Sequence, residues 1–192
     1  MKKLIVGISG ASGVIYGIRL LEVLRDVDEI ETHLVLSSAA RRTIPLETDY
    51  APDQVESLAD QVYRIGDIAA AVSSGSFASA GMVVAPCSMK TVSGIATSFS
   101  DNLLLRAADV ILKERRRLVL LVRETPLHLG HLRLLVQVTE LGALVMPPMP
   151  AFYHRPADLH AVIDQTVNRV LDQFDIELPV DLFQRWSGPA TP

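Results

Sequence analysis

Apolar and polar positions alternate along the chain with two different periods. Short apolar runs rich in Val, Ile and Leu, typical of buried parallel strands, occupy residues 4–8, 31–36, 81–85, 118–122 and 144–146. Between and after them, apolar residues recur at helical spacing over residues 14–24, 102–114, 129–141 and 156–174. This alternation predicts an α/β fold with a doubly wound, mainly parallel sheet.

The first predicted strand leads directly into a glycine-rich turn and a helix. Gly7, Gly10 and Gly13 follow the spacing G-x-x-G-x-x-G, which is neither the dinucleotide motif nor a P-loop. The second strand ends in Ser37 and Ser38, without the acidic residue that would hold an NAD ribose. A helix start after such a turn suits a phosphate, so the pattern favours a mononucleotide or a flavin phosphate. The alternative is a tight turn whose glycines only allow close packing of strand and helix.

Composition limits the class of protein. The 192 residues, 49% of them hydrophobic, suffice for one domain, which we place at residues 1–178, followed by a C-terminal tail at 179–192. A net charge of −4 gives no basic excess for nucleic acid, and no apolar run approaches the roughly 18 residues of a membrane span. The start of the chain fits a signal peptide poorly and the single cysteine cannot form an internal disulfide, so a cytoplasmic location is expected. A mean hydropathy of +0.29 with few aromatic residues predicts apolar surface buried between subunits of an oligomer.

Ligands of doubly wound sheets lie beyond the carboxyl ends of the strands, so the residues that directly follow four of the predicted strands are the candidates for a binding site. These are Gly10, Ala11 and Ser12, then Ser37, then Ser88, Met89, Lys90 and Thr91, and finally Arg123 and Glu124. Their hydroxyls, backbone amides and cations are suited to contact a phosphate or a flavin. Taken singly, Ser88, Thr91 and Thr125 are also explained by helix capping, so their joint placement is the stronger signal.

Seven segments, in order, resemble the UbiX family of flavin prenyltransferases. They are GISGASG, LSSAARRTIPLETD, SSGSF, APCSMKT, RAADVILKERRRLVLLVRETPLHLGHL, PAFYHRP and NRVLDQF, and together the resemblance covers nearly the whole chain. It implies a Rossmann-like three-layer sandwich that binds reduced FMN and transfers a dimethylallyl group from dimethylallyl monophosphate to N5 and C6 of that flavin. It also implies a homododecamer whose prenylated FMN product serves UbiD-type decarboxylases, in ubiquinone synthesis among other pathways.

The same resemblance implies roles for individual residues. The implied FMN contacts are Gly10, Ala11, Ser12, Ser37, Ser88, Met89, Lys90, Thr91 and Arg123. The implied contacts of the prenyl phosphate are Lys113, Arg123, Tyr153 and Arg169, with Trp186 near the prenyl group. The implied catalytic residues are Ser12, Glu47, Lys113 and Glu124; Glu47 would move protons at the departing phosphate or at flavin N5, and Ser12 would orient the N5 side.

Prenyl transfer would require positively charged side chains beside the departing phosphate. Departure of phosphate from an allylic carbon places negative charge on the leaving group, which Lys113 and Arg169 would stabilise in a partly dry pocket. No metal is then required, and although His128 and His131 have a spacing that suits a metal, no third ligand stands out. Cys87 is interpreted as a small buried residue, because no His lies close to it in sequence.

Without the resemblance, the same residues have simpler explanations. Lys113 lies in a charge run at a helix end, and Arg169 would be a surface arginine with a packed stem. Two other functions remain as alternatives. An FMN-dependent cysteine-type decarboxylase would share the fold, although its typical P-x-M-N-x-x-M-W signature is absent here. A non-enzymatic FMN carrier would need the FMN contacts but not Glu47 or Lys113.

Overall fold

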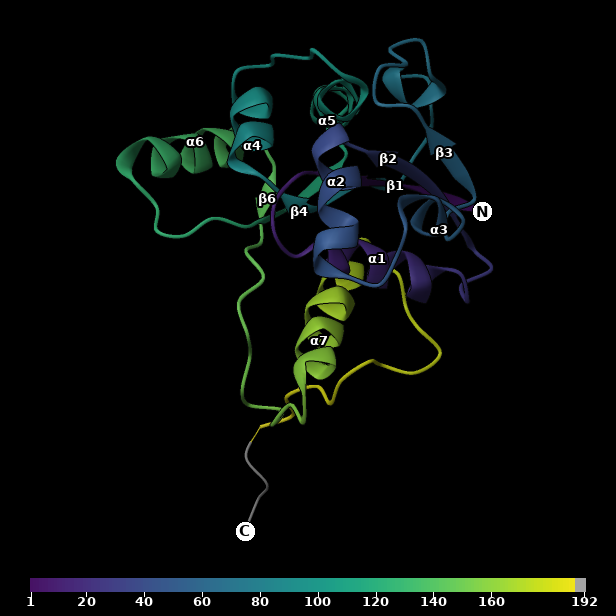
Figure 1. Ribbon diagram of the computed structural model, residues 1–192, viewed down its shortest axis with the longest axis vertical. Coiled ribbons are helices and arrows are strands. Elements are labelled where there is room, and N and C mark those ends of the chain that lie inside the picture. The colour runs from purple at the N-terminus through teal and green to yellow at the C-terminus, as the bar shows by residue number, and fades with distance from the viewer. Residues whose placement is uncertain (189–192) are drawn as a thin grey trace.

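Six strands pair in parallel in the order β3-β2-β1-β4-β5-β6 in the computed structural model, which describes residues 1–188 (Figure 1). Their bounds are β1 (Lys2–Ile8), β2 (Ile30–Leu36), β3 (Gln61–Tyr63), β4 (Gly81–Cys87), β5 (Arg117–Val122) and β6 (Leu144–Val145). This strand order reverses between β1 and β4, as in doubly wound nucleotide-binding folds. The predicted fold class is therefore confirmed. The last four residues of the predicted tail, 189–192, lie outside the described residues.

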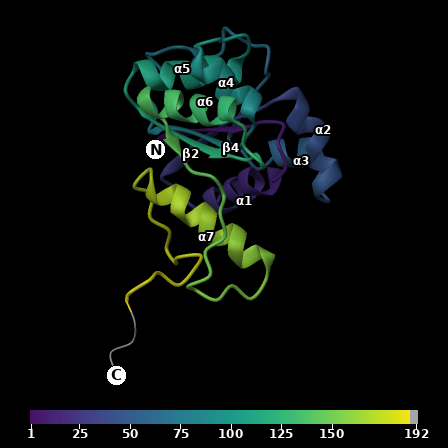
Figure 2. The ribbon, with the colours of Figure 1, turned by 90° about the vertical axis from the view of Figure 1, so that its left-hand side faces the viewer.

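Helices cover both faces of the sheet. Among residues 1–188 they are α1 (Val14–Leu24), α2 (Ser38–Glu47), α3 (Pro52–Glu56), α4 (Met89–Ala96), α5 (Leu103–Lys113), α6 (Leu129–Glu140) and α7 (Leu159–Asp172), with a 3₁₀ turn at Ala71–Ser73. Figure 2 shows α1 and α7 on one face of the sheet and α4, α5 and α6 on the other. None of the helices among these residues is long and apolar enough to cross a lipid bilayer.

The central strands supply side chains to two separate cores. On β4, Val83 and Ala85 pack in the core beneath α1 and α7, whereas Met82 and Val84 pack in the core beneath α4 and α5. All seven residues of β4 are buried, because successive side chains of a strand point to opposite faces and helices cover both. Burial on both faces explains why the sequence of this strand is apolar without alternation.

Boundaries predicted from the sequence agree with the structure to within a few residues. The helix predicted over residues 14–24 has those bounds, but the last helix begins at Leu159 rather than near Pro156. Its start is fixed by the side chain of Asp158, which accepts a hydrogen bond from the Ala161 N–H at 2.9 Å.

Four elements were not predicted, namely α2, α3, α4 and the short edge strand β3. Helix α2 buries only Ala40 and Ile44 and contains Pro45, so it lacks a clear apolar period. Ser37 nevertheless starts this helix, because its Oγ accepts a hydrogen bond from the Ala40 N–H at 3.0 Å.

Helix α6 projects from the body of the protomer, at the left of Figure 1. Leu129, Leu132 and Val136 on this helix are between 46% and 60% exposed. Neighbouring apolar side chains with this exposure are typical of a surface that another protein chain covers. The feature agrees with the oligomer predicted from mean hydropathy.

Candidate functional site

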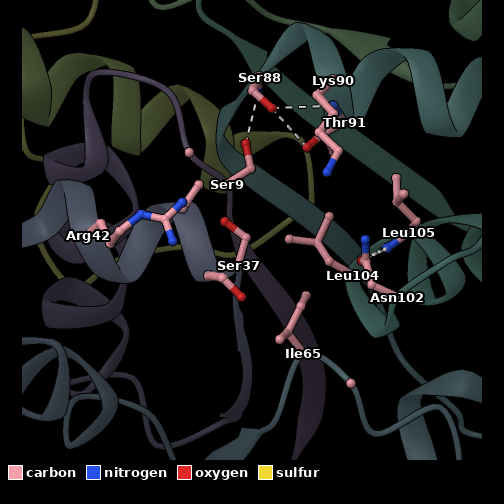
Figure 3. Close-up of a pocket in the computed structure, with 14 residues that line it drawn as sticks. Ser9, Ser37, Arg42, Ile65, Ser88, Lys90, Thr91, Asn102, Leu104 and Leu105 are labelled. Atoms are coloured by element: carbon pink, nitrogen blue, oxygen red, sulfur yellow. Dashed lines mark hydrogen bonds between the residues drawn. The ribbon is translucent and has the colours of Figure 1, made fainter.

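A cavity of about 410 Å³ lies at the carboxyl ends of the central strands. Its lining comes from the segments that follow β1, β2, β3 and β4, together with the start of α5. The lining residues are Ser9, Gly10, Ser37, Ser38, Ala39, Arg42, Ile65, Gly66, Ser88, Lys90, Thr91, Asn102, Leu104 and Leu105 (Figure 3). This is the topological switch point, where doubly wound sheets bind their ligands.

The cavity combines three kinds of surface. Ile65, Leu104 and Leu105 form an apolar part, which suits a flat aromatic ring. Hydroxyl groups come from the ends of β1, β2 and β4. Arg42 from α2 and Lys90 from α4 add two cations, which suit a phosphate. Its volume lies within the roughly 300–1,000 Å³ of small-molecule sites, so these residues fit a flavin mononucleotide.

Ser9 joins the ends of the two central strands at the floor of this site. Its Oγ donates to the carbonyl oxygen of Pro86 at 2.9 Å and accepts from the Ser88 N–H at 2.8 Å. Ser9 is only 1% exposed, so water cannot reach these groups and the two hydrogen bonds satisfy them within the protein. They hold the start of the segment that carries Ser88, Lys90 and Thr91.

Ser88 continues this network onto α4. Its Oγ lies 3.1 Å from the Thr91 Oγ1 and accepts from the Thr91 N–H at 3.3 Å, as Figure 3 shows. Ser88 is therefore the N-cap of α4, the simpler role considered from the sequence, and it lines the cavity as well. Met89, by contrast, is buried among the core side chains beneath α4.

The amino end of α1 is occupied by a carboxylate of the same chain. Glu47, at the end of α2, accepts hydrogen bonds at its Oε2 from the Gly13 N–H at 2.8 Å and the Val14 N–H at 3.3 Å. A negative group is favourable at this position because it completes the free N–H groups of the helix. These N–H groups lie at the helix start that the sequence suggests for a phosphate, and within the single chain they bond to Glu47, whose side chain is exposed.

Two glycines of the turn are required by packing and by backbone conformation. A Cβ on Gly10 would lie 2.2 Å from the Cβ of Ala39, and Gly13 has a φ of 96°, in the left-handed region. Close packing, the alternative considered from the sequence, thus explains Gly10, which also lines the cavity, whereas Gly13 is explained by its backbone conformation. Ala11 and Ser12 lie next to it in the turn, and the Ser12 side chain is exposed.

Arg123 and Glu124 follow β5 at the same edge of the sheet. The Arg123 N–H donates to the carbonyl oxygen of Cys87 at 3.0 Å, which keeps this segment beside the end of β4. Both side chains are exposed, and Glu124 Oε1 accepts from the Thr125 N–H at 3.1 Å. The backbone therefore lies near the site, although neither residue lines the cavity within the described chain.

Lys113 lies near the amino ends of the strands, whereas the cavity of its own chain lies at their carboxyl ends. Helix α5 begins at Leu103, directly after the cavity-lining Asn102, and ends at Lys113, just before β5 starts at Arg117. Eleven residues of helix span about 16 Å. The Lys113 ammonium pairs with Glu114, which lowers the pKa of that carboxyl by hydrogen bonding. A single chain does not bring Lys113 to the other predicted site residues.

Tyr153, Arg169 and Trp186 form a second group, associated with α7. The ring centroids of Tyr153 and Trp186 lie 6.0 Å apart with an interplanar angle of 70°. Gln165 Nε2 donates to the Tyr153 hydroxyl at 3.5 Å, and Arg169 lies one turn further along the same helix. None of these three predicted residues lines the cavity in the described chain.

Ser9, Arg42, Asn102 and the apolar residues of the cavity were not predicted as site residues. Ser9 had a usable signal, since it directly follows the first strand. Arg42 had none, because helix α2 itself was not predicted.

The residues considered for metal or thiol chemistry have structural explanations. His128 is the N-cap of α6, where its Nδ1 accepts from the N–H groups of Gly130 and His131 at 3.0 and 3.3 Å. Cys87 is fully buried, and burial raises the pKa of its thiol. Among residues 1–188, no group of three or more His, Cys, Asp and Glu side chains is placed to hold a metal ion.

Comparisons with known proteins agree with this geometry. The flavoprotein family model matches residues 1–171. The chain is 68% identical over 188 residues to "Flavin prenyltransferase UbiX" of Escherichia coli strain K12, which covers 98% of this chain and 100% of that protein.

Two solved structures share the fold over nearly the whole chain. The crystal structure of AnUbiX (PadA1) in complex with FMN and dimethylallyl pyrophosphate has a TM-score of 0.93 at 51% identity, covering 97% of this chain and 98% of that one. A dodecameric FMN-dependent UbiX-like decarboxylase from Escherichia coli O157:H7 has a TM-score of 0.92 at 48% identity, covering 97% and 99%.

Proposed function

The chain belongs to the UbiX flavin prenyltransferases of the flavoprotein family, and we propose that it transfers a dimethylallyl group from dimethylallyl monophosphate to N5 and C6 of reduced FMN. The observation that carries this proposal is the cavity at the β1–β4 switch point, where an apolar surface meets hydroxyl groups and two cations. The related AnUbiX structure holds FMN and a dimethylallyl ester, which supports the same pair of substrates here.

FMN occupies the cavity in this proposal. Leu104 and Leu105 lie against its ring, and Arg42 and Lys90 attract its phosphate, because these are the two cations in the lining. Bound reduced flavin supplies the nucleophile for the allylic carbon. Ser12, in the glycine turn beside Gly10, orients the N5 side of the ring.

The transfer would break the carbon–oxygen bond of the ester, with the electron pair leaving on the phosphate, while N5 loses its proton as it bonds to the allylic carbon. The second bond, at C6, would use the electrons of the prenyl double bond, with one proton added to that double bond and one lost from C6. Glu47 is placed beside the glycine turn, where it moves a proton at the flavin or at the departing phosphate. Lys113, Arg123 and Arg169 stabilise the charge on the leaving phosphate, with the Tyr153 hydroxyl as a further donor. Glu124 supplies the second carboxylate of the site, and Trp186 lies against the prenyl group.

Several subunits build one such site. Lys113 lies near the amino ends of the strands, away from its own cavity, so it contacts the ester only in the cavity of another subunit. The exposed apolar side chains of α6 support an oligomer, and a related protein of 48% identity is dodecameric. We therefore propose a homododecamer in the cytoplasm, whose product is delivered to a UbiD-type decarboxylase in ubiquinone synthesis or a related aromatic-acid pathway. We further propose that residues 1–178 form a single domain, followed by a C-terminal tail at 179–192.

Mass spectrometry of the flavin tests the proposed reaction. The protein is incubated with reduced FMN and dimethylallyl monophosphate without oxygen, and in a parallel reaction with the diphosphate. We expect the flavin to gain one C5 unit, faster with the monophosphate. A flavin of unchanged mass would contradict prenyl transfer and would leave the FMN-dependent decarboxylase or the FMN carrier, which a cysteine-containing peptide substrate then separates.

A further inference from the structure

The C-terminal segment is attached to α7 by Arg185, an arginine with no part in the proposed reaction steps. Arg185 makes two hydrogen bonds to Asp181, from Nε at 2.6 Å and from Nη2 at 2.7 Å. It makes two more to Asp172, from Nη1 at 3.0 Å and from Nη2 at 2.8 Å. One planar guanidinium thus joins both carboxylates in the forked geometry that arginine favours.

A buried side chain of α7 fixes the start of the same segment. Asn168, only 2% exposed, accepts a hydrogen bond at Oδ1 from the Leu182 N–H at 2.8 Å. Leu182 itself packs against the core beneath α7. The segment 182–186 is therefore held at both of its ends, by Asn168 near its start and by Arg185 immediately before Trp186.

Asp172 also contacts Arg169, which together with Tyr153 and Trp186 is proposed to bind the prenyl phosphate ester. Its Oδ2 also accepts a hydrogen bond from Arg169 Nη1 at 2.8 Å. The hydrogen bond from Arg185 is the largest cause of the lowered pKa of Asp172, and Arg169 contributes less. Two guanidinium groups and two carboxylates meet here. The positive charge of Arg185 therefore offsets part of the negative charge of Asp172, which Arg169 would otherwise face alone.

Tyr153, another of the proposed contacts of the ester, lies against the same segment. Trp186 is edge-on to the ring of Tyr153, and residues 153–155 and 184–188 together line a hollow of about 290 Å³. Gln165, Arg169 and Asp172 follow one another at spacings of four and three residues, so they share one face of α7. That face contacts both Tyr153 and the C-terminal segment.

We propose that Arg185 is a positioning residue for the binding of the prenyl phosphate. It holds the segment that places Trp186 against Tyr153, and it neutralises part of the charge of Asp172, which Arg169 also contacts, so that more of the positive charge of Arg169 remains available to a phosphate ester. This inference rests on the proposed function, in which Tyr153, Arg169 and Trp186 contact the ester. An isolated exposed ion pair would have little effect, but a guanidinium that binds two carboxylates at once is a network.

Steady-state kinetics and the fluorescence of Trp186 test this role in the full-length protein. Trp186 is the only tryptophan of the chain, so its time-resolved anisotropy without flavin reports the nanosecond mobility of this segment alone. We expect Arg185→Gln to raise the KM for dimethylallyl monophosphate about tenfold, with a smaller change in kcat and unchanged affinity for FMN. The fast component of the anisotropy decay should grow. Arg185→Lys should resemble Arg185→Gln, because an ammonium cannot make both forks.

A second substitution separates the two parts of the role. Adding Asp172→Asn to Arg185→Gln removes the charge that competes for Arg169, so the KM should fall again while the segment stays mobile. Arg25→Gln, at an exposed position after α1, serves as the control and should change neither quantity. If Arg185→Gln does not fold, Asp181→Asn tests the same attachment with a smaller expected effect.

Three results would overturn the proposal. They are an unchanged KM in Arg185→Gln, an unchanged anisotropy, and an equal loss of affinity for FMN, which would indicate general damage to the fold. If the wild-type protein leaves the mass of FMN unaltered, the proposed function fails. The anisotropy then decides the attachment by itself: a mobile Trp186 in Arg185→Gln supports it, and an unaffected one overturns it.

Discussion

Glu47 closes the amino end of helix α1 by accepting a hydrogen bond from the Gly13 N–H at 2.8 Å, across 34 positions of the sequence. The contact joins the end of α2 to the turn after β1, so it fixes one side of the cavity. The same carboxylate has a proposed role in proton transfer. The capping role of Glu47 and its proposed role in proton transfer can be tested separately, by a substitution that keeps the cap and removes the proton carrier.

Glu47→Gln should preserve the cap and remove the proton carrier. Because an amide oxygen still accepts the Gly13 N–H, we expect the free energy of unfolding to change by less than about 0.5 kcal/mol. Turnover should fall by about 10²–10⁴-fold, the usual contribution of a positioned acid or base. Glu47→Ala should lower both turnover and stability, the latter by about 1 kcal/mol, as loss of a helix cap does. Turnover and urea unfolding are measured on the same variants. Wild-type turnover in Glu47→Gln would show that Glu47 acts only as a helix cap.

Ser9→Ala should destabilise the protein more than its small size suggests. The substitution leaves the buried Ser88 N–H without its partner, which typically costs about 1–3 kcal/mol, whereas the Pro86 carbonyl still accepts from the backbone N–H of residue 9 at 3.2 Å. The affinity for FMN should fall as well, since Ser88 and Thr91 lose their support. Ser57→Ala is the matched control, because the Ser57 hydroxyl donates to the Gln54 carbonyl at an exposed position. Equal unfolding free energies for the two variants would contradict the role of Ser9.

The sheet and most of its helices were predictable because their burial leaves a period in the sequence. The strands β1, β4 and β5 are apolar because both faces are covered, and α1 and α5 carry apolar residues at helical spacing. Helix α2 escaped prediction because only two of its ten residues are buried, and its start depends on a capping serine. A pattern of burial cannot reveal an element that buries little.

The site was predictable only at the ends of strands. Ser37, Ser88, Lys90 and Thr91 line the cavity because topology brings the carboxyl ends of parallel strands together. The assignment of Lys113 came from the resemblance, and nothing in the spacing of the chain shows that it lies near the amino ends of the strands. The mutual contact of Arg169, Asp172 and Arg185 depends on how the C-terminal segment folds back on α7, which local patterns do not encode.

Arg42→Gln should weaken the binding of FMN but not of riboflavin. The guanidinium lines the cavity with Lys90, and riboflavin lacks the phosphate that these cations would attract. Loss of one charge-assisted contact should raise the Kd for FMN about tenfold, equivalent to about 1.4 kcal/mol. The neighbouring Arg41 pairs with Glu56 instead, so Arg41→Gln provides the control. Titration of flavin fluorescence measures both ligands, and parallel losses for FMN and riboflavin would refute a phosphate contact.

Asp60 should make stability depend on pH at the acidic end. Its Oδ2 accepts from the Thr32 N–H at 2.7 Å and from the Thr32 hydroxyl at 2.8 Å, and the backbone bond is the main cause of its lowered pKa. The folded state therefore favours the ionised carboxylate. This stabilisation is present above the ordinary pKa of about 3.9 and is lost as the pH falls through the lower value of the folded state.

Asp60→Asn measures this contribution directly. The variant should unfold more easily than the wild type at pH 7, and the difference in unfolding free energy should shrink as the pH falls below about 4. Asp28→Asn, at an exposed position in the turn before β2, should show no such dependence. A difference between Asp60→Asn and wild type that is constant from pH 7 to pH 3 would show that ionisation of Asp60 is not responsible.

Lys113→Ala should reduce turnover without disturbing the flavin site. Removal of one donor to a developing charge lowers rates by about 10²–10³-fold, whereas the affinity for FMN should stay at the wild-type value because the proposed contact of Lys113 is the ester phosphate and not the flavin. Co-expression with Glu47→Gln then identifies the subunit that supplies the lysine. A cavity with Glu47 from one variant can receive Lys113 from the other only if the lysine crosses between subunits. Mixed oligomers should therefore regain part of the turnover that each variant lacks alone, and mixtures no more active than the separate proteins would place Lys113 outside the shared site.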